Sequence, residues 1–489
     1  MAVSLYTSRV VLLTLGINDY GIYSVVGGVV SLLSFFNSAM SSATQRFLSY
    51  DIGLQNYSRL RDTFNATLII HVLIAVAIFF LAETFGMWFL KTKLVIPPMR
   101  MEAAEWVLHF SILSFSVNVM QVPFNAIIIA REKMEIYAAM SIFEVLLKLA
   151  IVYVLQMENF DKLKLYSVLF FIVSLLIAAI YRIYCFINLK ETRYKFFYNK
   201  EYFVTLISYS GWNLFGNLAS VAKGQGVNIV LNIFSGPALN AAYGIMLQVQ
   251  GNVTSFSTNF QLAANPQIIK SFAQNNIEEC KNLIFKSSKY SFFLMMIIIS
   301  PVIINVKFIL TLWLGTPPQY TEEFIILCLI NTLVDCISGP LMTGAQATGK
   351  IKWYQITVGC LVFLNLPFSY LLLASDANPT SIFYLSIFLS IISLNFRLFF
   401  LKNNLGISIL SFYREVILKI VLISLSIYTL YFVLFHKLGT ESNNATTIIK
   451  TVLIMTISVV SILVLGLDND EKKTIKKAMF RKFILNDKA

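Results

Sequence analysis

Apolar runs of about twenty residues recur along the whole chain, separated by short polar links. A helix rises about 1.5 Å per residue and the hydrocarbon layer is about 30 Å thick, so about 20 mostly apolar residues make one crossing. Backbone amides in lipid must be paired within the protein, and solid runs such as 294–300 lack the alternation of a barrel strand. The sequence therefore predicts an all-α polytopic membrane protein with about 14 transmembrane helices. The runs are 1–15, 21–45, 66–90, 104–129, 136–156, 163–187, 203–234, 237–262, 290–313, 324–346, 352–374, 380–401, 416–436 and 446–466.

The composition leaves no room for a catalytic domain outside the bilayer. Hydrophobic residues make up 57% of the chain and charged residues 13%, and no stretch longer than about 25 residues lacks an apolar run. The segment 344–350 has the spacing of a phosphate-binding loop, but Ile351 replaces the required Ser or Thr. The five cysteines and three histidines are scattered, so we expect no metal centre, no cofactor and no enzyme activity.

The net charge of +13 is mainly a signal of topology. When the links are assigned alternately to two sides, one side holds 27 Lys and Arg and the other holds 6. The positive-inside rule makes the rich side cytoplasmic and places both termini inside. The basic tail, 467–489, is expected to touch anionic lipid headgroups, and nucleic-acid binding is not expected.

A weak internal repeat divides the chain. Tyr20-Gly21-Ile22 is echoed by Tyr243-Gly244-Ile245 at an offset of 223, and Pro123 is echoed by Pro340 at 217. Six helices per half give both halves the same orientation, which is the parallel repeat of some transporters with a site between the halves. The prediction is an N-terminal lobe at 1–187, a C-terminal lobe at 203–402, two appended helices at 416–466 and the tail at 467–489.

The first run is short for a crossing and begins abruptly at Met1. We therefore expect the true start codon to lie about 20 residues upstream, by comparison with the seventh helix. A signal peptide is the competing interpretation, but Arg9 interrupts the run and no small-residue cleavage site follows.

Charged residues deep in the runs are the first candidates for function, because a charge at the bilayer centre costs about 2.5 to 3.5 kcal/mol. Arg9 and Lys223 lie in the helices that open each repeat, and Arg46 lies at the inner mouth of helix two. Glu144 is one turn before Lys148, so the two either form a local ion pair or line a cavity.

Polar residues spaced three and four apart form stripes along single helix faces, which favours a polar cavity between the helices. The bland alternative is that small polar residues hold helices together. The stripe of helix two includes Ser31, Ser34, Ser38, Ser41 and Gln45, that of helix seven Asn213, Asn217, Ser220, Gly224 and Asn228, and that of helix eight Gln248, Asn252, Ser255 and Asn259. Asp335, mid-run in helix ten, is predicted either to take a coupling proton or sodium ion or to bond its neighbours. Pro123 and Pro340 are predicted to break helices four and ten.

Three segments resemble a known family. They are Val3-Ser-Leu-Tyr-Thr-Ser-Arg9-Val-Val-Leu, Leu15-Gly16-Ile-Asn-Asp-Tyr20-Gly21-Ile-Tyr23 and Ser41-Ser-Ala-Thr-Gln45-Arg46-Phe-Leu. They resemble the opening of bacterial lipopolysaccharide and capsule repeat-unit flippases of the Wzx type. That family belongs to the multidrug/oligosaccharidyl-lipid/polysaccharide exporter superfamily. The resemblance covers the whole chain, which departs from the family in lacking the cytoplasmic start of helix one.

The resemblance implies a two-lobed transporter of the bacterial inner membrane. Such a protein moves an undecaprenyl-pyrophosphate-linked oligosaccharide to the outer leaflet by alternating access, for O-antigen or capsule synthesis, possibly with polysaccharide-assembly partners. Substrate contacts would be Arg9, Arg46 and Lys223 with Ser38, Gln45, Asn213, Asn217 and Asn228, and a coupling H+ or Na+ would use Asp335 or Glu144. The alternatives are a cation-coupled drug antiporter of the same superfamily, a membrane polysaccharide polymerase or ligase, and a scaffold that transports nothing.

Overall fold

The structure is a computed structural model that describes residues 34–92, 94, 96–157, 160–437 and 444–473. Before Ser34 it describes positions 10, 11, 14–16, 19, 22, 23, 26, 27 and 30. Every regular element among these residues is helical, as predicted. The chain forms two compact units. Unit 1 comprises Met1–Val221, Asn265–Asn276 and Gly349–Gly359, and unit 2 comprises Ala222–Ala264, Ile277–Thr348 and Cys360–Ala489.

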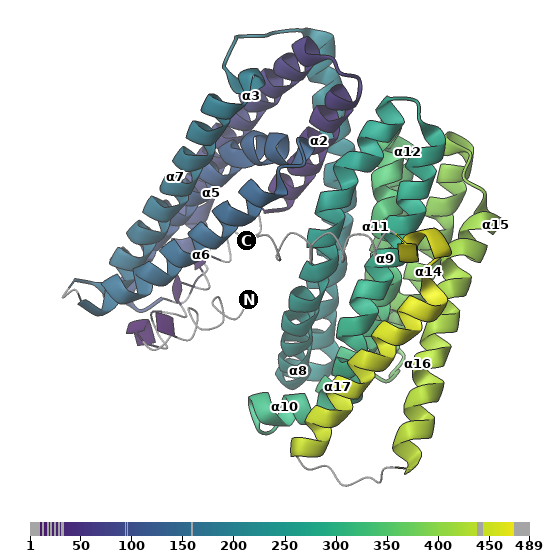
Figure 1. Ribbon diagram of the computed structural model, residues 1–489. Helices are drawn as coiled ribbons and strands as arrows, with labels where there is room; N and C mark the ends of the chain where they lie inside the picture. The colour runs from purple at the N-terminus through teal and green to yellow at the C-terminus, as the bar shows by residue number, and fades with distance from the viewer. Residues whose placement is uncertain are drawn as a thin grey trace, which may run out of the picture. The chain divides into compact units, whose positions relative to one another are not determined.

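Unit 1 is a helical bundle built around α5 (Figure 1). The span that contains α5 is 61% buried, against 17% for the span of α6, so α5 is central to the unit and α6 lies at its edge. Side-chain caps begin two of the helices: Asn56 accepts from the Arg59 amide at α3, and Asp161 accepts from the Leu163 amide at α7. The elements are α2 (Ser34–Gly53), α3 (Tyr57–Leu81), η1 (Ala82–Gly86), α4 (Met87–Thr92), η2 (Pro98–Arg100), α5 (Met101–Ala130), α6 (Met134–Met157), α7 (Lys162–Asn188), η3 (Lys190–Thr192) and the front of α8 (Lys200–Ala273).

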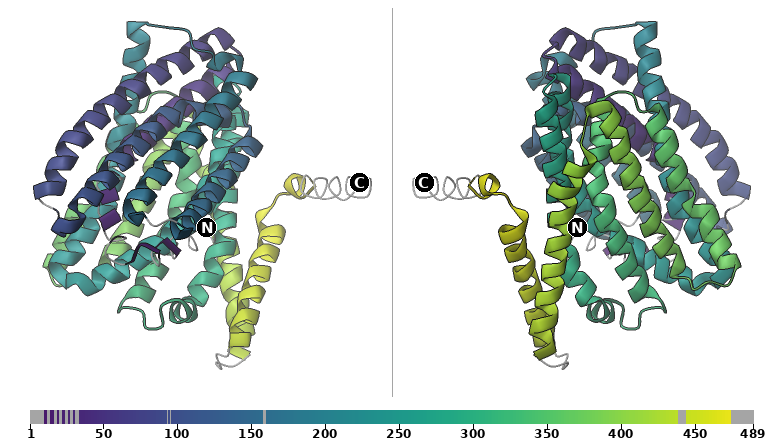
Figure 2. Two further views of the ribbon diagram at one scale, coloured as in Figure 1. Left: turned by 90° about the vertical axis from the view of Figure 1, so that its left-hand side faces the viewer. Right: turned by 90° about the vertical axis from the view of Figure 1, so that its right-hand side faces the viewer.

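Unit 2 is built in the same way around α11, whose span is 67% buried. Helices α9 and α14 contact α11, and α16 and α17 lie side by side at the edge of the unit (Figure 2). The elements are α9 (Ile277–Ile304), α10 (Val306–Leu314), α11 (Thr321–Ala347), the end of α12 (Lys352–Phe363), α13 (Asn365–Ala374), α14 (Ser381–Leu405), α15 (Ile409–Phe412), η4 (Tyr413–Ile417), α16 (Leu418–Lys437), α17 (Asn444–Ser461) and η5 (Ile462–Gly466). The residues of α12 up to Gly359 belong to unit 1.

Helix α8 is 74 residues long, and it turns back on itself. The Tyr243 hydroxyl donates to the carbonyl oxygen of Gly224 at 3.1 Å, although residues 19 apart in a straight helix would be separated by about 28 Å. The element therefore contains two arms, which correspond to the seventh and eighth apolar runs. Polar side chains interrupt the apolar surface of both arms.

Ten helices among the described residues are long and apolar enough to cross a membrane. They coincide with ten of the fourteen predicted runs, the third to sixth and the ninth to fourteenth. The seventh and eighth runs are the arms of α8, and the first run and the front of the second fall largely outside the described residues. The predicted lobe boundaries and the cytoplasmic location of both termini stay predictions.

The two matched prolines do not break their helices, contrary to expectation. Pro123 lies inside the continuous α5 and Pro340 inside the continuous α11. A proline lacks the amide that would bond the carbonyl four residues earlier. At Pro340 that carbonyl belongs to Cys336, and the Gln261 side-chain amide donates to it at 2.9 Å. Gly339 allows this approach, because a Cβ there would lie 2.1 Å from Gln261 Oε1.

Replacing Gln261 with Leu should destabilise unit 2, because the carbonyl of Cys336 would lose its partner in a water-free interior. Gln261 also donates to the Ser291 hydroxyl at 3.0 Å. We expect a loss of about 1 to 3 kcal/mol, measured as a lower thermal midpoint of the purified protein in detergent. Gln248→Leu, at an exposed position on the same arm, is the matched control. Equal midpoints for the two variants would contradict the role of Gln261.

Candidate functional site

A line of polar side chains, buried at Asn213 and Gln355 and open at Ser38, joins α2, the first arm of α8 and the start of α12 within unit 1. Ser38 Oγ donates to Asn217 Oδ1 at 3.3 Å, and Asn217 Nδ2 donates to the Asn213 carbonyl at 2.9 Å. Gln355 Nε2 donates to Asn213 Oδ1 at 2.7 Å. We call Ser38, Asn213, Asn217 and Gln355 the polar seam. Three of its four members come from the predicted stripes, and Gln355 was missed.

The polar seam has unused hydrogen-bonding capacity. Among the described residues, Asn213 Nδ2 and Nε2 of the stripe residue Gln45 are buried and form no hydrogen bond of standard geometry, although the Asn213 side chain lies close to the Tyr209 hydroxyl. Gly216 lets Gln355 lie across α8, because a Cβ at this glycine would be 2.2 Å from Gln355 Oε1. A buried amide donor without a partner is costly, so these two groups are available to a polar ligand.

Arg46 is less open to water than its predicted place at the inner mouth implies. It is 8% exposed, and its guanidinium carbon lies 4.7 Å from the ring centroids of Phe47 and Tyr50 and 5.5 Å from that of Tyr209. Aromatic faces attract a cation by their negative quadrupole, which stabilises the partly desolvated charge. The arginine therefore has a packing role in addition to any role in binding.

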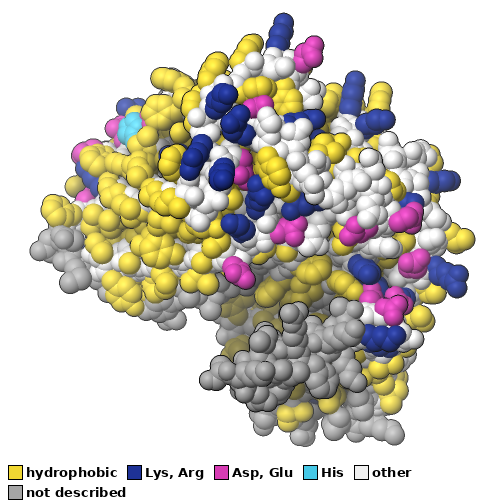
Figure 3. Space-filling model, turned by 45° about the horizontal axis from the view of Figure 1, so that its top comes forward, with side chains coloured by type: hydrophobic (Ala, Val, Ile, Leu, Met, Phe, Trp, Pro, Cys, Tyr) yellow, Lys and Arg dark blue, Asp and Glu magenta, His cyan; other side chains and the backbone are white. Residues whose placement is uncertain are grey.

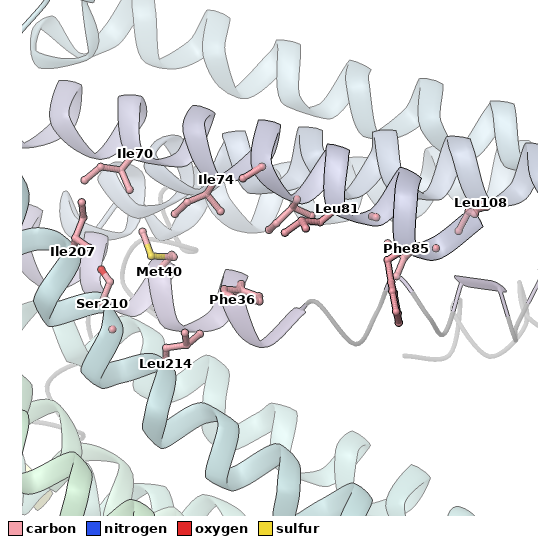
Figure 4. A pocket seen from close by; sticks show the side chains of 16 residues that line it. Phe36, Met40, Ile70, Ile74, Leu81, Phe85, Leu108, Ile207, Ser210 and Leu214 are labelled. Carbon is pink, nitrogen blue, oxygen red and sulfur yellow. The ribbon is translucent and has the colours of Figure 1, made fainter. Parts of the chain in front are cut away.

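An apolar pocket of about 640 Å³ lies on other faces of α2 and the first α8 arm. Figure 4 shows Phe36 and Met40 of α2, Ile74 of α3 and Leu214 of α8 around it. The π-helical turn η1 contributes Phe85. The pocket could not be predicted from the sequence, because apolar pocket walls and apolar core have the same residue types. The full lining is Val30, Phe36, Met40, Ile70, Ile74, Ala77, Ile78, Leu81, Ala82, Phe85, Gly86, Leu108, Ile207, Ser210, Gly211 and Leu214.

Unit 2 holds three of the other predicted site residues. Lys223 and Asp335 both act electrostatically on the Cys328 thiol, which places the ammonium and the carboxylate in the same region. Asp335 is exposed and accepts from Asn331 Nδ2 at 2.9 Å. Lys223 forms no ion pair within the described part of the chain, and Asn228 is half-buried in the same arm of α8. A carboxylate with this exposure can exchange a cation, as a coupling role would need.

Glu144 and Lys148 form the local ion pair that was one of the two alternatives, with Lys148 Nζ at 2.6 Å from Glu144 Oε1. The ammonium also lies 5.2 Å from the Phe170 ring centroid. A coupling role for Glu144 stays a prediction. Arg9 and Ser31 lie outside the described residues, so their predicted places are untested.

An ion cluster, buried at Lys289 and Glu471, anchors the start of the C-terminal tail. Lys289, whose side chain is 5% exposed, lies 2.8 Å from Glu471 Oε2 and 3.4 Å from Asp468 Oδ2. Lys419 pairs with the other Asp468 oxygen at 2.6 Å. This cluster could not be predicted from the sequence, because its lysines are 49 to 182 residues from its carboxylates. Residues 468–471 are thus fixed to unit 2 rather than freely solvated.

The fold has clear relatives among known proteins. The sequence model of the MatE family matches residues 1–154 and 214–371, which is more than half of the chain. The chain belongs to the MatE family. Members are membrane transporters and not enzymes, which confirms the expectation of a multi-pass transporter without catalytic activity. No curated protein sequence matches the chain at a significant level.

Three solved structures illustrate the likeness of fold. A multidrug resistance MATE family transporter of the MOP superfamily, in an outward-facing conformation, gives a TM-score of 0.69 at 11% identity, covering 83% of this chain and 92% of that one. A MOP superfamily transporter from Pyrococcus furiosus gives 0.69 at 11% identity, covering 83% and 93%. The MATE transporter ClbM in complex with Rb+ gives 0.55 at 14% identity, covering 83% and 94%.

The ion cluster generates a prediction for acid. Burial opposes ionisation of Glu471, but the Lys289 hydrogen bond and the Asp468 amide outweigh it and lower the pKa below the ordinary 4.5. The hydrogen bond from Lys419 likewise lowers the pKa of Asp468 below the ordinary 3.8, and the positive charge of Lys289 lowers it further. Carboxylates whose folded pKa is depressed stabilise the fold above their unfolded pKa. This contribution should therefore be lost as the pH falls below about 4.5.

Lys289→Met should cost about 3 to 5 kcal/mol at pH 7, because it leaves a buried carboxylate without its partner. Without the lysine, burial raises the pKa of Glu471, so the stability of the variant should increase as the pH falls from 7 to about 5. Thermal midpoints in detergent across this range measure both effects. Lys281→Met breaks an exposed pair with Glu278 and should cost less than about 1 kcal/mol. A flat pH response in the Lys289 variant would contradict the assignment.

Proposed function

We propose that the protein is a flippase of the bacterial cytoplasmic membrane. Its substrate would be an undecaprenyl-pyrophosphate-linked oligosaccharide, carried to the outer leaflet by alternating access for O-antigen or capsule synthesis. The observation that carries this proposal is the presence, on the same two helices of unit 1, of polar side chains with buried amide donors that form no hydrogen bond, on Gln45 and Asn213, and of a mainly apolar pocket. An amphipathic substrate needs both surfaces. The sequence resemblance to Wzx-type flippases supports the same substrate class.

Each part of the substrate has matching chemistry in the chain. Side-chain amides of Gln45, Asn213 and Asn217 can bond sugar hydroxyls, which donate and accept in the same way as water. The cations Arg9, Arg46 and Lys223 would attract the pyrophosphate. Asp335 would exchange the coupling H+ or Na+, since a charge moved across the membrane is worth about 2.3 kcal/mol per 100 mV.

A cation-coupled drug antiporter is the second candidate function. The apolar pocket favours it, because hydrophobic drugs bind pockets lined mainly by apolar side chains. The structural neighbours include a multidrug resistance transporter and a transporter in complex with Rb+. The polar seam and the basic candidates favour the flippase instead. The MOP superfamily transporter from Pyrococcus furiosus is described as having a binding pocket of reversed polarity, which suggests a different function for that protein.

Transport in proteoliposomes should separate the two functions. We expect the wild-type protein to move a defined undecaprenyl-pyrophosphate-linked oligosaccharide between leaflets, measured by the access of an added glycosidase to the sugar. Asn213→Ala with Asn217→Ala should lower the rate at least about tenfold, since two hydrogen bonds of about 1 kcal/mol each are lost.

The matched control is Asn404→Ala. Asn404 donates to the carbonyl four residues earlier at 2.9 Å, as Asn217 does, but it is exposed at the end of α14. This variant should transport at the wild-type rate. Efflux of a lipophilic cationic dye without any oligosaccharide transport would reject the flippase and support the antiporter.

A further inference from the structure

A second cavity in unit 1, which is polar, has no part in the proposed transport. It is a cleft of about 630 Å³ where the start of α3, the turn between α5 and α6 and the end of α7 meet. Its charged lining is Arg61, Arg131, Lys133, Lys190 and Glu191, and we call it the basic cleft. Many Lys and Arg side chains gather on the upper part of the face seen in Figure 3.

The basic cleft carries an excess of positive charge that nothing in its own lining neutralises. Glu191 is the one carboxylate of the lining and is 8% exposed. It is already bonded to Arg131, at 2.8 Å from Nε and 2.5 Å from Nη2. Arg61, Lys133 and Lys190 have no acidic partner among the described residues, and the buried Nε of Arg61 has no hydrogen bond there.

Two cations of the cleft, Arg131 and Lys133, are held in place before any ligand arrives, the second by a hydrogen bond from Lys133 Nζ to the Tyr184 hydroxyl at 3.4 Å. Arg131 lies over the Tyr57 ring at 5.4 Å in addition to its bonds to Glu191. The turn that carries Arg131 and Lys133 is fixed by Glu132, which pairs with Lys270 of unit 1 at 2.6 Å. When donors are already fixed, binding loses less side-chain conformational entropy.

The basic cleft lies at the ends of four membrane spans. The spans Tyr57–Thr92, Pro98–Ala130, Met134–Leu155 and Lys162–Asn188 all begin or end within four residues of its cations. The last turn of α7 exposes Phe186 and Ile187, which are 61% and 70% exposed, just before the cleft. Its position is therefore that of lipid headgroups, with acyl chains able to lie along α7.

We propose that the basic cleft binds the phosphate headgroup of an anionic membrane lipid. The planar guanidinium of Arg61 can bind two phosphate oxygens, and Lys133 and Lys190 add point charges. Basic pockets between transmembrane helices on the cytoplasmic side are suited to anionic headgroups. The inference is independent of the transported substrate.

The test uses the full chain in nanodiscs of phosphatidylcholine, with or without one fifth phosphatidylglycerol, and counts retained lipids by native mass spectrometry. Each surface cation contributes about 1 kcal/mol, so Arg61→Gln with Lys133→Gln should weaken phosphatidylglycerol retention about thirtyfold. Lys402→Gln with Arg414→Gln removes two exposed cations of the same predicted side and should retain it as the wild type does.

Three outcomes would overturn the proposal. One is equal retention in the two double variants. Another is no preference of the wild type for phosphatidylglycerol over phosphatidylcholine. A third is full displacement by millimolar inorganic phosphate, which would identify a site for a soluble anion. Should the double variant fail to fold, Lys190→Gln at an exposed position is expected to weaken retention about fivefold, and an unchanged value would count against the cleft equally.

Discussion

The structure depends on one constraint, which is that a polar group inside a bilayer helix must find its partner within the protein. The helices satisfy their own backbones, so the remaining demand comes from side chains and from the places where a helix departs from regularity. Gln261 meets such a demand at the carbonyl of Cys336, which Pro340 leaves unpaired. Tyr243 caps the carbonyl of Gly224 close to the reversal of α8. Between α2 and α8, the side chains of the polar seam provide hydrogen-bond partners for one another.

The same constraint explains why the seam is a candidate for function. A set of polar residues that only held helices together would satisfy every donor, because each unsatisfied one has a cost. Here two buried amide donors, on Gln45 and Asn213, form no hydrogen bond of standard geometry among the described residues. The hydroxyl or phosphate oxygens of a ligand could accept hydrogen bonds from these two donors. The apolar pocket on the neighbouring faces supplies the opposite chemistry.

The sequence predicted the helices well, because a bilayer imposes both their length and their apolarity. Ten predicted runs coincide with ten spans, and the stripes in helices two and seven led to Ser38, Asn213 and Asn217, which the structure brings together. Periodicity identifies which residues share a helix face. It predicted the contact between α2 and α8 because the facing surfaces of both helices are polar.

Other features could not be predicted, since they depend on contacts between distant segments. Gln355 joins the seam from 142 residues away, and Lys289 meets Glu471 from 182. The aromatic surroundings of Arg46 depend on Tyr209 of another helix. The prolines were expected to break helices, but a side chain from α8 can replace the missing bond at Pro340. Fold alone does not decide the substrate, because relatives with 11% identity share this architecture.

The central claim is that the polar seam contacts the sugar part of a lipid-linked substrate, and cysteine protection tests it most directly. In a Cys360→Ser background, which removes the exposed native thiol, Asn217→Cys would be labelled with a water-soluble maleimide in proteoliposomes. Added undecaprenyl-pyrophosphate-linked oligosaccharide should slow labelling at position 217 and leave Asn404→Cys unaffected. Unchanged labelling at 217, under conditions in which the oligosaccharide is transported, would contradict the account.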